Sequence, residues 1–302
     1  MKRLRFGRSR RPAPAPAAPS IEGIVIGDLG GPTAVVDDVG RIGALDGSWS
    51  LEWGAGADDR WHVAHEEVAV RQRRIVDAPV LETAMRIPGG DLVQRVASVN
   101  DGQGRALVVE YHNASAEGVA LGLVVRTAGL LTVGPDELRV GADHVIVCPD
   151  RPAGGVVATG GDPWPAVFSG PPAELTHAEA TDVGGALIVA LPHRQRVSFT
   201  VVLDGSRHPA RATDPESVAA GWRVLTADAA SIDVPDPALV EAWRRIVPDL
   251  VVAAGDRDAH VAAEAAWFLD LAGLHEEADR ARVGVVVAAD QGSMRGLSLI
   301  HI

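Results

Sequence analysis

The sequence predicts a mainly β protein, in which a large antiparallel two-sheet β-sandwich is followed by a region of α-helical hairpins. Three observations support this prediction. Short apolar or alternating runs recur between residues 21 and 203, at the spacing of roughly 8–12 residues that is typical of sandwiches and barrels. Residues 197–201 alternate apolar and polar side chains, which is the period of a strand with one buried face. Beyond residue 236 the apolar residues recur at helical spacing instead.

The chain is predicted to begin with a disordered tail, residues 1–20. Basic residues, Lys2 among them, crowd the first eleven positions, and proline then alternates with alanine. Alternating proline favours an extended chain that does not pack. A tether to nucleic acid or to another anionic surface is the alternative interpretation of such a basic tail.

Residues 21–212 are predicted to form the β-sandwich domain. Turn-forming residues separate its apolar runs, as at Pro88-Gly89-Gly90, Asn100-Asp101-Gly102 and Pro171-Pro172. The roughly one dozen runs exceed the seven strands of an immunoglobulin domain, and their regular spacing favours an antiparallel sandwich over βαβ units. A large two-sheet sandwich follows from this count.

Residues 213–235 are predicted to be a helical linker. Asp214 is placed to cap a helix whose first position is Pro215. Asp236-Pro237 repeats the same start signal, which marks the beginning of the helical region at residues 236–296.

Three helices are predicted within that region. Pro248 should kink or break the first of them. The second is expected to run from about Asp258 to Ala272, with Gly273 as the residue that ends it. The third begins near His275, and the short loop before it indicates an αα-hairpin.

Composition and charge narrow the possible functions. The formal net charge is -12 although basic residues gather at the amino terminus, so the folded part is too acidic to be expected to bind nucleic acid. Cys148 is the only cysteine, which excludes an internal disulfide and a Cys-based zinc site. The chain has neither a signal-peptide pattern nor an apolar run of about 18 residues, so a cytoplasmic protein without a membrane span is predicted. Lys2 is the only lysine, and with the abundant Ala, Gly and Val this resembles a high-GC bacterial proteome, such as that of an actinobacterium.

The densest cluster of unusual residues is segment 49–61, which holds three of the seven tryptophans of the chain. Trp53, Asp58, Asp59 and Trp61 are predicted to bind a carbohydrate substrate. Tryptophan faces stack on the apolar C–H faces of sugars, and carboxylates hydrogen-bond to their hydroxyls. The alternative is that the tryptophans pack in the core while the residues between them only join two strands.

Other polar residues give weaker indications. His62 and His65 are three positions apart and would point to opposite faces of a strand, so no metal site is predicted. No cofactor is predicted, because the glycines of residues 27–31 are not followed by a helix. Glu110 and His112 share a strand face, where they could perform the acid–base chemistry of a sugar mutarotase or form a satisfied polar pair.

Several stretches together resemble the bacterial six-hairpin glycosidases, the glucoamylase-like and glycogen-debranching-like families. They are SWSLEWGAGADDRW with the later ETAMRIPGGDLVQRVASVNDGQGRALVVEYHN, the linker from about Asp214 to Pro237, and VEAWRRIV with AAWFLDLAGLHEEADRA. The resemblance covers about residues 21–295. It implies an amino-terminal β-supersandwich joined to an (α/α)6 barrel, of which residues 236–296 would be the first helices.

The resemblance also implies a function. Glycosidases of this kind hydrolyse an α-linked glucan or a related oligosaccharide with two carboxylates. In these families the carboxylates lie mostly beyond the first hairpins, and no residue of this chain matches their motifs. The chain is therefore expected to be an inactive amino-terminal fragment, with residues 297–302, which resemble adapter read-through, as a non-native tail.

Two alternatives remain open. One is a non-catalytic carbohydrate-binding or scaffolding protein whose β-sandwich is the working part. The other is a mutarotase-like sugar epimerase, which leaves the helical region unexplained.

Overall fold

The computed structural model describes residues 21–100, 104–134, 137–141, 144–147, 154–159, 162–169, 178–203 and 213–290. The predicted tail at residues 1–20, the predicted non-native residues 297–302 and Cys148 lie outside the described residues. Within the described ranges, no helix is long and apolar enough to cross a membrane.

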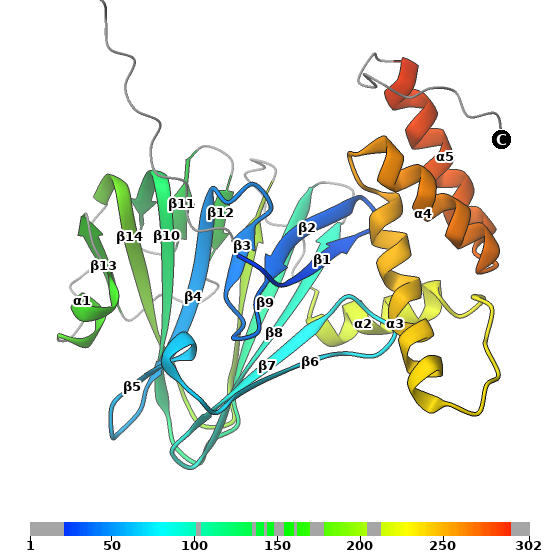
Figure 1. Ribbon diagram of the computed structural model, residues 1–302. Coiled ribbons are helices and arrows are strands. Elements are labelled where there is room, and N and C mark those ends of the chain that lie inside the picture. The colour runs from blue at the N-terminus through cyan, green and yellow to red at the C-terminus, as the bar shows by residue number, and fades with distance from the viewer. Residues whose placement is uncertain are drawn as a thin grey trace, which may run out of the picture.

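The predicted fold class, a mainly β sandwich followed by a helical region, is confirmed (Figure 1). In the described part of the chain, fifteen strands form one antiparallel hydrogen-bonded network. They are β1 (Ile24–Asp28), β2 (Gly31–Val36), β3 (Ile42–Ala44), β4 (Trp49–Gly56), β5 (Trp61–Val63), β6 (Val70–Arg74), β7 (Leu81–Ile87), β8 (Gly90–Asn100), β9 (Arg105–Asn113), β10 (Val119–Val133), β11 (Glu137–Val140), β12 (His144–Val147), β13 (Gly154–Thr159), β14 (Ala178–Leu191) and β15 (Arg196–Val202).

The network folds into two facing layers. The first layer contains the neighbouring strands β4, β10, β14 and β13. The second layer contains β6, β7, β8, β9 and β15. In the order of hydrogen-bonded strands, β11 and β12 connect β10 of the first layer to β15 of the second. The rings of Trp53 on β4 and Tyr111 on β9 lie 5.6 Å apart although these strands do not pair. Their contact therefore crosses from one layer to the other.

The main core lies between these layers. Val197, Phe199 and Val201 of β15 are buried in it, as the alternating sequence predicts. Trp49 and Tyr111 are among its largest fully buried side chains. Burying an apolar side chain of this kind stabilises a fold by roughly 1.5–3 kcal/mol, so this core dominates the stability of the sandwich.

The outer face of the second layer carries a ladder of alternating charges. Glu82 on β7 accepts hydrogen bonds from Nε of Arg73 (2.7 Å) and Nε of Arg95 (2.9 Å). Glu110 on β9 lies 3.6 Å from Arg95 and 3.2 Å from Arg196. Burial opposes the ionisation of Glu82, but the two guanidinium groups hold its pKa below the usual range. The ladder therefore links five strands with paired charges.

Helices occur within the sandwich and after it. A 3-10 helix, η1 (Ala64–Glu66), and α1 (Trp164–Phe168) lie within it, and α2 (Pro215–Leu225), α3 (Pro237–Ala254), α4 (Ala259–Leu271) and α5 (His275–Asp290) follow. Oδ1 of Asp214 accepts a hydrogen bond from the amide of Ser217 at 2.9 Å, and Oδ1 of Asp236 accepts one from Ala238 at 2.9 Å. Both predicted start signals are thus confirmed as N-caps.

Of the two outcomes predicted for Pro248, a kink or a break, the structure excludes the break. Pro248 does not break α3, which continues as one helix. An interior proline removes one backbone hydrogen bond, but Val247, Val251 and Val252 around it are buried, and this packing offsets the loss. Gly273, with φ of 82°, follows α4 in the left-handed conformation, as predicted for the residue that ends a helix.

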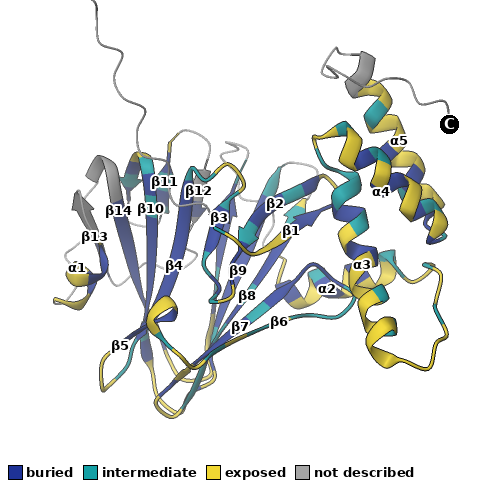
Figure 2. Ribbon diagram, viewed as in Figure 1, coloured by how far each residue is buried: buried dark blue, intermediate teal, exposed yellow. Residues whose placement is uncertain are grey.

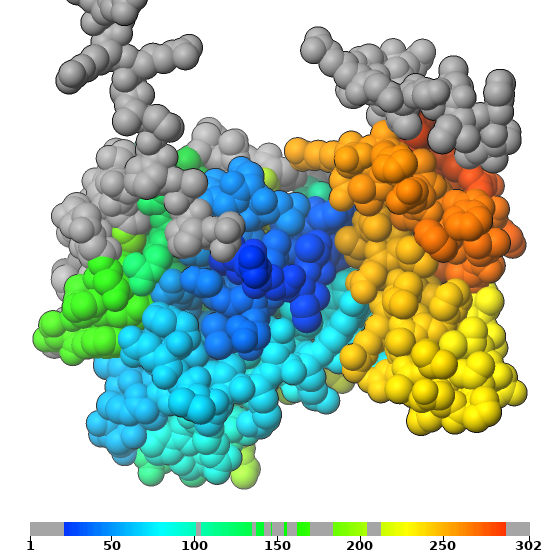
Figure 3. Space-filling view, in the orientation of Figure 1, coloured from blue at the N-terminus to red at the C-terminus, as the bar shows by residue number. Residues whose placement is uncertain are grey.

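Helix α3 contacts β1 and β2 at the edge of the sandwich, whereas α2 contacts β8 and β9. The space-filling view shows the helical region packed beside the sandwich (Figure 3). Trp222 of α2 is buried with Ala78, Val80 and Ala97 of the sandwich in a second apolar cluster. In contrast, much of α4 and α5 is exposed (Figure 2), and some of the exposed side chains are apolar. These include Trp267, Phe268, Leu271, Val283 and Val286.

Candidate functional site

The loop between α3 and α4, residues 255–258, lies where the sandwich meets the helices. Its Gly255 contacts Gly31 at the β1–β2 turn, backbone against backbone. A Cβ atom added to Gly31 would lie 2.1 Å from the carbonyl oxygen of Gly255, and one added to Gly255 would lie 2.4 Å from the nitrogen of Gly31. Only glycine permits so close an approach, so this contact fixes the loop against the sandwich.

The loop is also ordered by its own aspartates. Oδ1 of Asp256 accepts a hydrogen bond from the amide of Asp258 at 2.8 Å. Oδ1 of Asp258 accepts one from the amide of His260 at 2.9 Å and so caps α4. Side-chain caps of this kind hold a helix start in one conformation. The intervening Arg257 is exposed on a well-defined loop.

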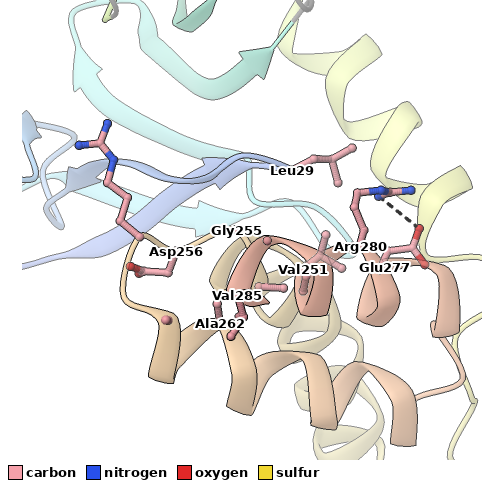
Figure 4. A pocket seen from close by; sticks show the side chains of 13 residues that line it. Leu29, Val251, Gly255, Asp256, Ala262, Glu277, Arg280 and Val285 are labelled. Atoms are coloured by element: carbon pink, nitrogen blue, oxygen red, sulfur yellow. Dashed lines mark ion pairs between the residues drawn. The ribbon is translucent and has the colours of Figure 1, made fainter. Parts of the chain in front are cut away.

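A cavity of about 520 Å³ opens on one side of this loop (Figure 4). Leu29 of the β1–β2 turn faces it from the sandwich, and Val251 faces it from α3. Glu277 and Arg280 of α5 form an ion pair of 3.8 Å on its wall. Its volume falls within the range of roughly 300–1,000 Å³ found for small-molecule sites, which favour boundaries between domains.

A second cavity, of about 470 Å³, lies on the other side of the loop. Asp256 and Arg257 line both cavities. The sandwich contributes Leu45, Asp46 and Arg105 to the second one. The two cavities together form one junction site that combines apolar surface with charged groups of both signs.

Arg105 is held in place by a buried polar cluster. Its Nε donates to Oδ2 of Asp28 at 3.0 Å, and Nη2 donates to Oγ1 of Thr33 at 2.7 Å. Oγ of Ser98 donates to the same Asp28 oxygen at 2.7 Å. Because Asp28 is buried, its charge needs these partners. The cluster fixes one wall of the second cavity.

The structure places the four predicted carbohydrate-binding residues in two different surroundings. Trp53 is 1% exposed and belongs to the core, where its Nε1 donates to the carbonyl oxygen of Val39 at 3.0 Å. A sugar cannot stack on a ring that is covered on both faces. The expectation that Trp53 binds substrate is therefore replaced by a structural role, which was the alternative interpretation.

Asp58, Asp59 and Trp61 lie together at the β4–β5 turn, at the end of the sandwich far from α3–α5 (Figure 1). Oδ1 of Asp59 is 3.0 Å from Nε2 of His62, and this hydrogen bond lowers the pKa of Asp59. Asp58 raises the pKa of Glu117 through a shared hydrogen bond and like charge. The structure thus brings together three of the four predicted residues and separates Trp53 from them.

The remaining polar residues have protein partners. His62 lies between Asp59 and Glu67, whereas His65 faces Glu52 at 3.7 Å. No group of three or more metal-ligating side chains occurs among the described residues. Glu110 is bound by two arginines in the ladder, and burial lowers the pKa of its neighbour His112. In the structure the partners of Glu110 are therefore arginines.

Sequence reasoning missed the junction site. Its walls come from residues 29–33, 44–49, 105, 203 and 251–285, and no local sequence pattern connects these segments. The glycines of residues 27–31 were considered only as a phosphate-binding loop. The segment Gly255-Asp256-Arg257-Asp258 could have indicated a site, because three charged residues follow a glycine directly before a predicted helix.

No protein-family model and no curated protein matches the chain by sequence. Among solved structures, a bacterial glucoamylase complexed with acarbose is similar, with a TM-score of 0.52 and 9% identity, over 74% of this chain and 38% of that one. An inverting mannosidase of family GH92 from Bacteroides thetaiotaomicron matches with a TM-score of 0.34 and 13% identity, over 68% and 26% of the two chains, which is too low to support an argument. The likeness to the glucoamylase shows a glycosidase-like fold. The chain spans 38% of the length of that enzyme.

Proposed function

We propose that this chain supplies the β-sandwich and the first helices of a glycoside hydrolase that acts on an α-linked glucan or a related oligosaccharide. The observation that carries the proposal is the position of the junction site, between a glycosidase-like sandwich and the helices that follow it. Sites at such boundaries commonly bind small molecules.

In this proposal the α3–α4 loop binds sugar hydroxyls. Arg257 offers several N–H donors and Asp256 offers carboxylate acceptors at the border of both cavities. Leu29 and Leu45 provide apolar surface for the C–H faces of a pyranose ring. The Gly31–Gly255 contact holds donors and acceptors at fixed positions, which reduces the entropy lost on binding.

Hydrolysis of a glycosidic bond needs a general acid and a second carboxylate about 5–10 Å apart on either side of the bond. Around the junction site, Glu277 is paired with Arg280, and one oxygen each of Asp256 and Asp46 accepts a hydrogen bond from a backbone amide of its own loop. We therefore propose that the 302-residue chain binds the oligosaccharide without hydrolysing it.

The test is calorimetric titration of the full chain with maltoheptaose, with a reducing-sugar assay run in parallel. We expect binding without release of reducing ends, and a clear loss of affinity in Arg257→Ala. Arg86→Ala, on the exposed face of β7, is the matched control and should bind like wild type. If maltoheptaose does not bind, or if Arg257→Ala binds it unchanged, the junction site is not the glucan site.

A non-catalytic carbohydrate-binding role is the second candidate. It is favoured by a different observation, the aromatic contacts of Trp61 with Trp164 and Phe168 at the far end of the sandwich.

A further inference from the structure

The outer face of the first layer is lined with glycine beneath large aromatic rings. A Cβ atom on Gly54 would lie 2.9 Å from the Trp164 ring, and one on Gly56 would lie 3.0 Å from the Trp61 ring. Gly122 on the neighbouring strand meets both rings, at 2.9 Å from Trp61 and 3.2 Å from Trp164. The three glycines thus let both indoles lie directly against the sheet, because no side chain lifts them away.

A third ring completes an aromatic patch, which consists of Trp61, Trp164 and Phe168. Trp164 is buried and stacks on Phe168 with ring centroids 5.8 Å apart and planes inclined by 27°. Trp61 lies 6.1 Å from Phe168 and is half-buried. Phe168 itself is 43% exposed. Phe168 and part of Trp61 therefore present aromatic surface to solvent, and the buried Trp164 supports them from below.

Polar groups border this patch. The buried Glu52 accepts hydrogen bonds from Nε1 of Trp164 (3.0 Å) and Nε of Arg126 (2.8 Å). Nη2 of Arg126 donates to Oδ1 of Asp162 at 2.7 Å. His65 is 3.7 Å from Glu52. The side chains of Arg126, Asp162 and His65 are all partly exposed. Hydrogen-bond donors and acceptors therefore lie beside the aromatic surface.

We propose that the aromatic patch binds the pyranose rings of an oligosaccharide, at a surface site separate from the junction. A pyranose presents an apolar C–H face that an aromatic ring covers, and a rim of hydroxyls that both donate and accept hydrogen bonds. The patch with its polar border complements both features. Carboxylates and a guanidinium so close to the rings would cost free energy under an apolar protein partner. The inference needs no hydrolysis and does not depend on the junction site.

This site revises the residues that the sequence suggested. Trp61 keeps a binding role, but its partners are Trp164 and Phe168 and not Trp53. Asp59 hydrogen-bonds to His62 at the β4–β5 turn. Asp162, which accepts hydrogen bonds from Arg126 and from the backbone amide of Trp164, supplies an exposed carboxylate beside the patch.

Calorimetric titration of the full chain with maltoheptaose and with cellohexaose tests the proposal, because the two probes separate an α-glucan from a β-glucan site. Phe168→Ala should lower the affinity of the aromatic patch for oligosaccharide by roughly tenfold. Asp162→Asn should lower the affinity of the same site. Leu130→Ala, an exposed apolar side chain elsewhere on the sandwich, is the matched control. Thermal melting verifies that each variant is folded. If Phe168→Ala does not fold, the affinity of Asp162→Asn still tests the proposal.

The variants also separate this proposal from the proposed function. If Arg257→Ala removes all binding while Phe168→Ala and Asp162→Asn bind normally, the aromatic patch is not a carbohydrate site and the junction proposal stands. If Phe168→Ala and Asp162→Asn remove all binding while Arg257→Ala binds normally, the patch proposal is supported and the junction proposal is wrong. If wild type binds neither oligosaccharide, both proposals are wrong.

Discussion

Replacing Gly31 with alanine probes the contact that fixes the α3–α4 loop against the sandwich. Gly31 has φ of 106°, and a Cβ atom there would lie 2.1 Å from the carbonyl oxygen of Gly255. A positive φ costs an L-residue about 1–2 kcal/mol, and overpacking a rigid contact costs typically ~1–3 kcal/mol. We therefore expect Gly31→Ala to lower the free energy of unfolding by about 2–5 kcal/mol, a large part of the roughly 5–15 kcal/mol of a typical domain.

Three other glycines separate the two contributions. Gly255→Ala meets the nitrogen of Gly31 at 2.4 Å but has φ of -93°, so it should lose only the ~1–3 kcal/mol of the clash. Gly141→Ala has φ of 60° in open space, so it should lose only the ~1–2 kcal/mol of the backbone conformation. Gly221→Ala, inside α2 with no atom within 4 Å, should gain ~0.5–1 kcal/mol from helix propensity.

Urea unfolding followed by circular dichroism and tryptophan fluorescence measures all four variants. The expected order of stability is Gly221→Ala, then wild type, then the two single-cause variants, then Gly31→Ala. If Gly31→Ala is no less stable than Gly141→Ala, and Gly255→Ala resembles wild type, the two backbones do not touch as described. The junction site would then lack its fixed position.

Further predictions concern the core, the polar cluster and pH. Trp53→Ala should lower the free energy of unfolding by ~3–5 kcal/mol, while Trp53→Phe, if folded, should bind maltoheptaose like wild type; weaker binding would restore a ligand role for that ring. Arg105→Met should lower stability by ~1–3 kcal/mol, because buried Asp28 loses a charged partner, and equal urea midpoints for variant and wild type would refute this. Burial, and next the positive charge of Arg196, lower the pKa of His112 below its ordinary 6.5, so the folded state binds fewer protons than the unfolded one. Stability should therefore fall as pH drops below about 6.5, and His112→Gln should reduce that fall in urea titrations at pH 5 and pH 7.5.

Local signals in the sequence predicted the fold well where a single residue determines the structure. Asp214 and Asp236 cap helices, and Gly273 adopts the left-handed conformation that ends one. Alternation placed Phe199 in the core. Of the kink or break predicted at Pro248, the break does not occur, because buried neighbours that no local pattern reveals stabilise the helix around it.

The site was harder to predict for two physical reasons. Strand β4 is buried along nearly its whole length, because the core covers one face and aromatic rings cover parts of the other. The alternation of apolar and polar residues along the strand therefore could not show that Trp53 points into the core. It also could not show that the neighbouring glycines lie beneath Trp61 and Trp164. The junction site depends on Gly31 and Gly255, which are far apart in the sequence, so only the folded chain brings its walls together.

The exposed apolar side chains of α4 and α5 have a practical consequence for the protein in solution. A surface with Trp267, Phe268 and Leu271 uncovered attracts its own copies, whereas the net charge of -12 repels them over a distance set by the ions in the buffer. At about 0.15 M salt that distance is only about 8 Å, and it shrinks further as salt is added. Ionic strength should therefore govern the colloidal behaviour of this protein, with dilute buffer keeping it dispersed and concentrated salt driving the helical ends together.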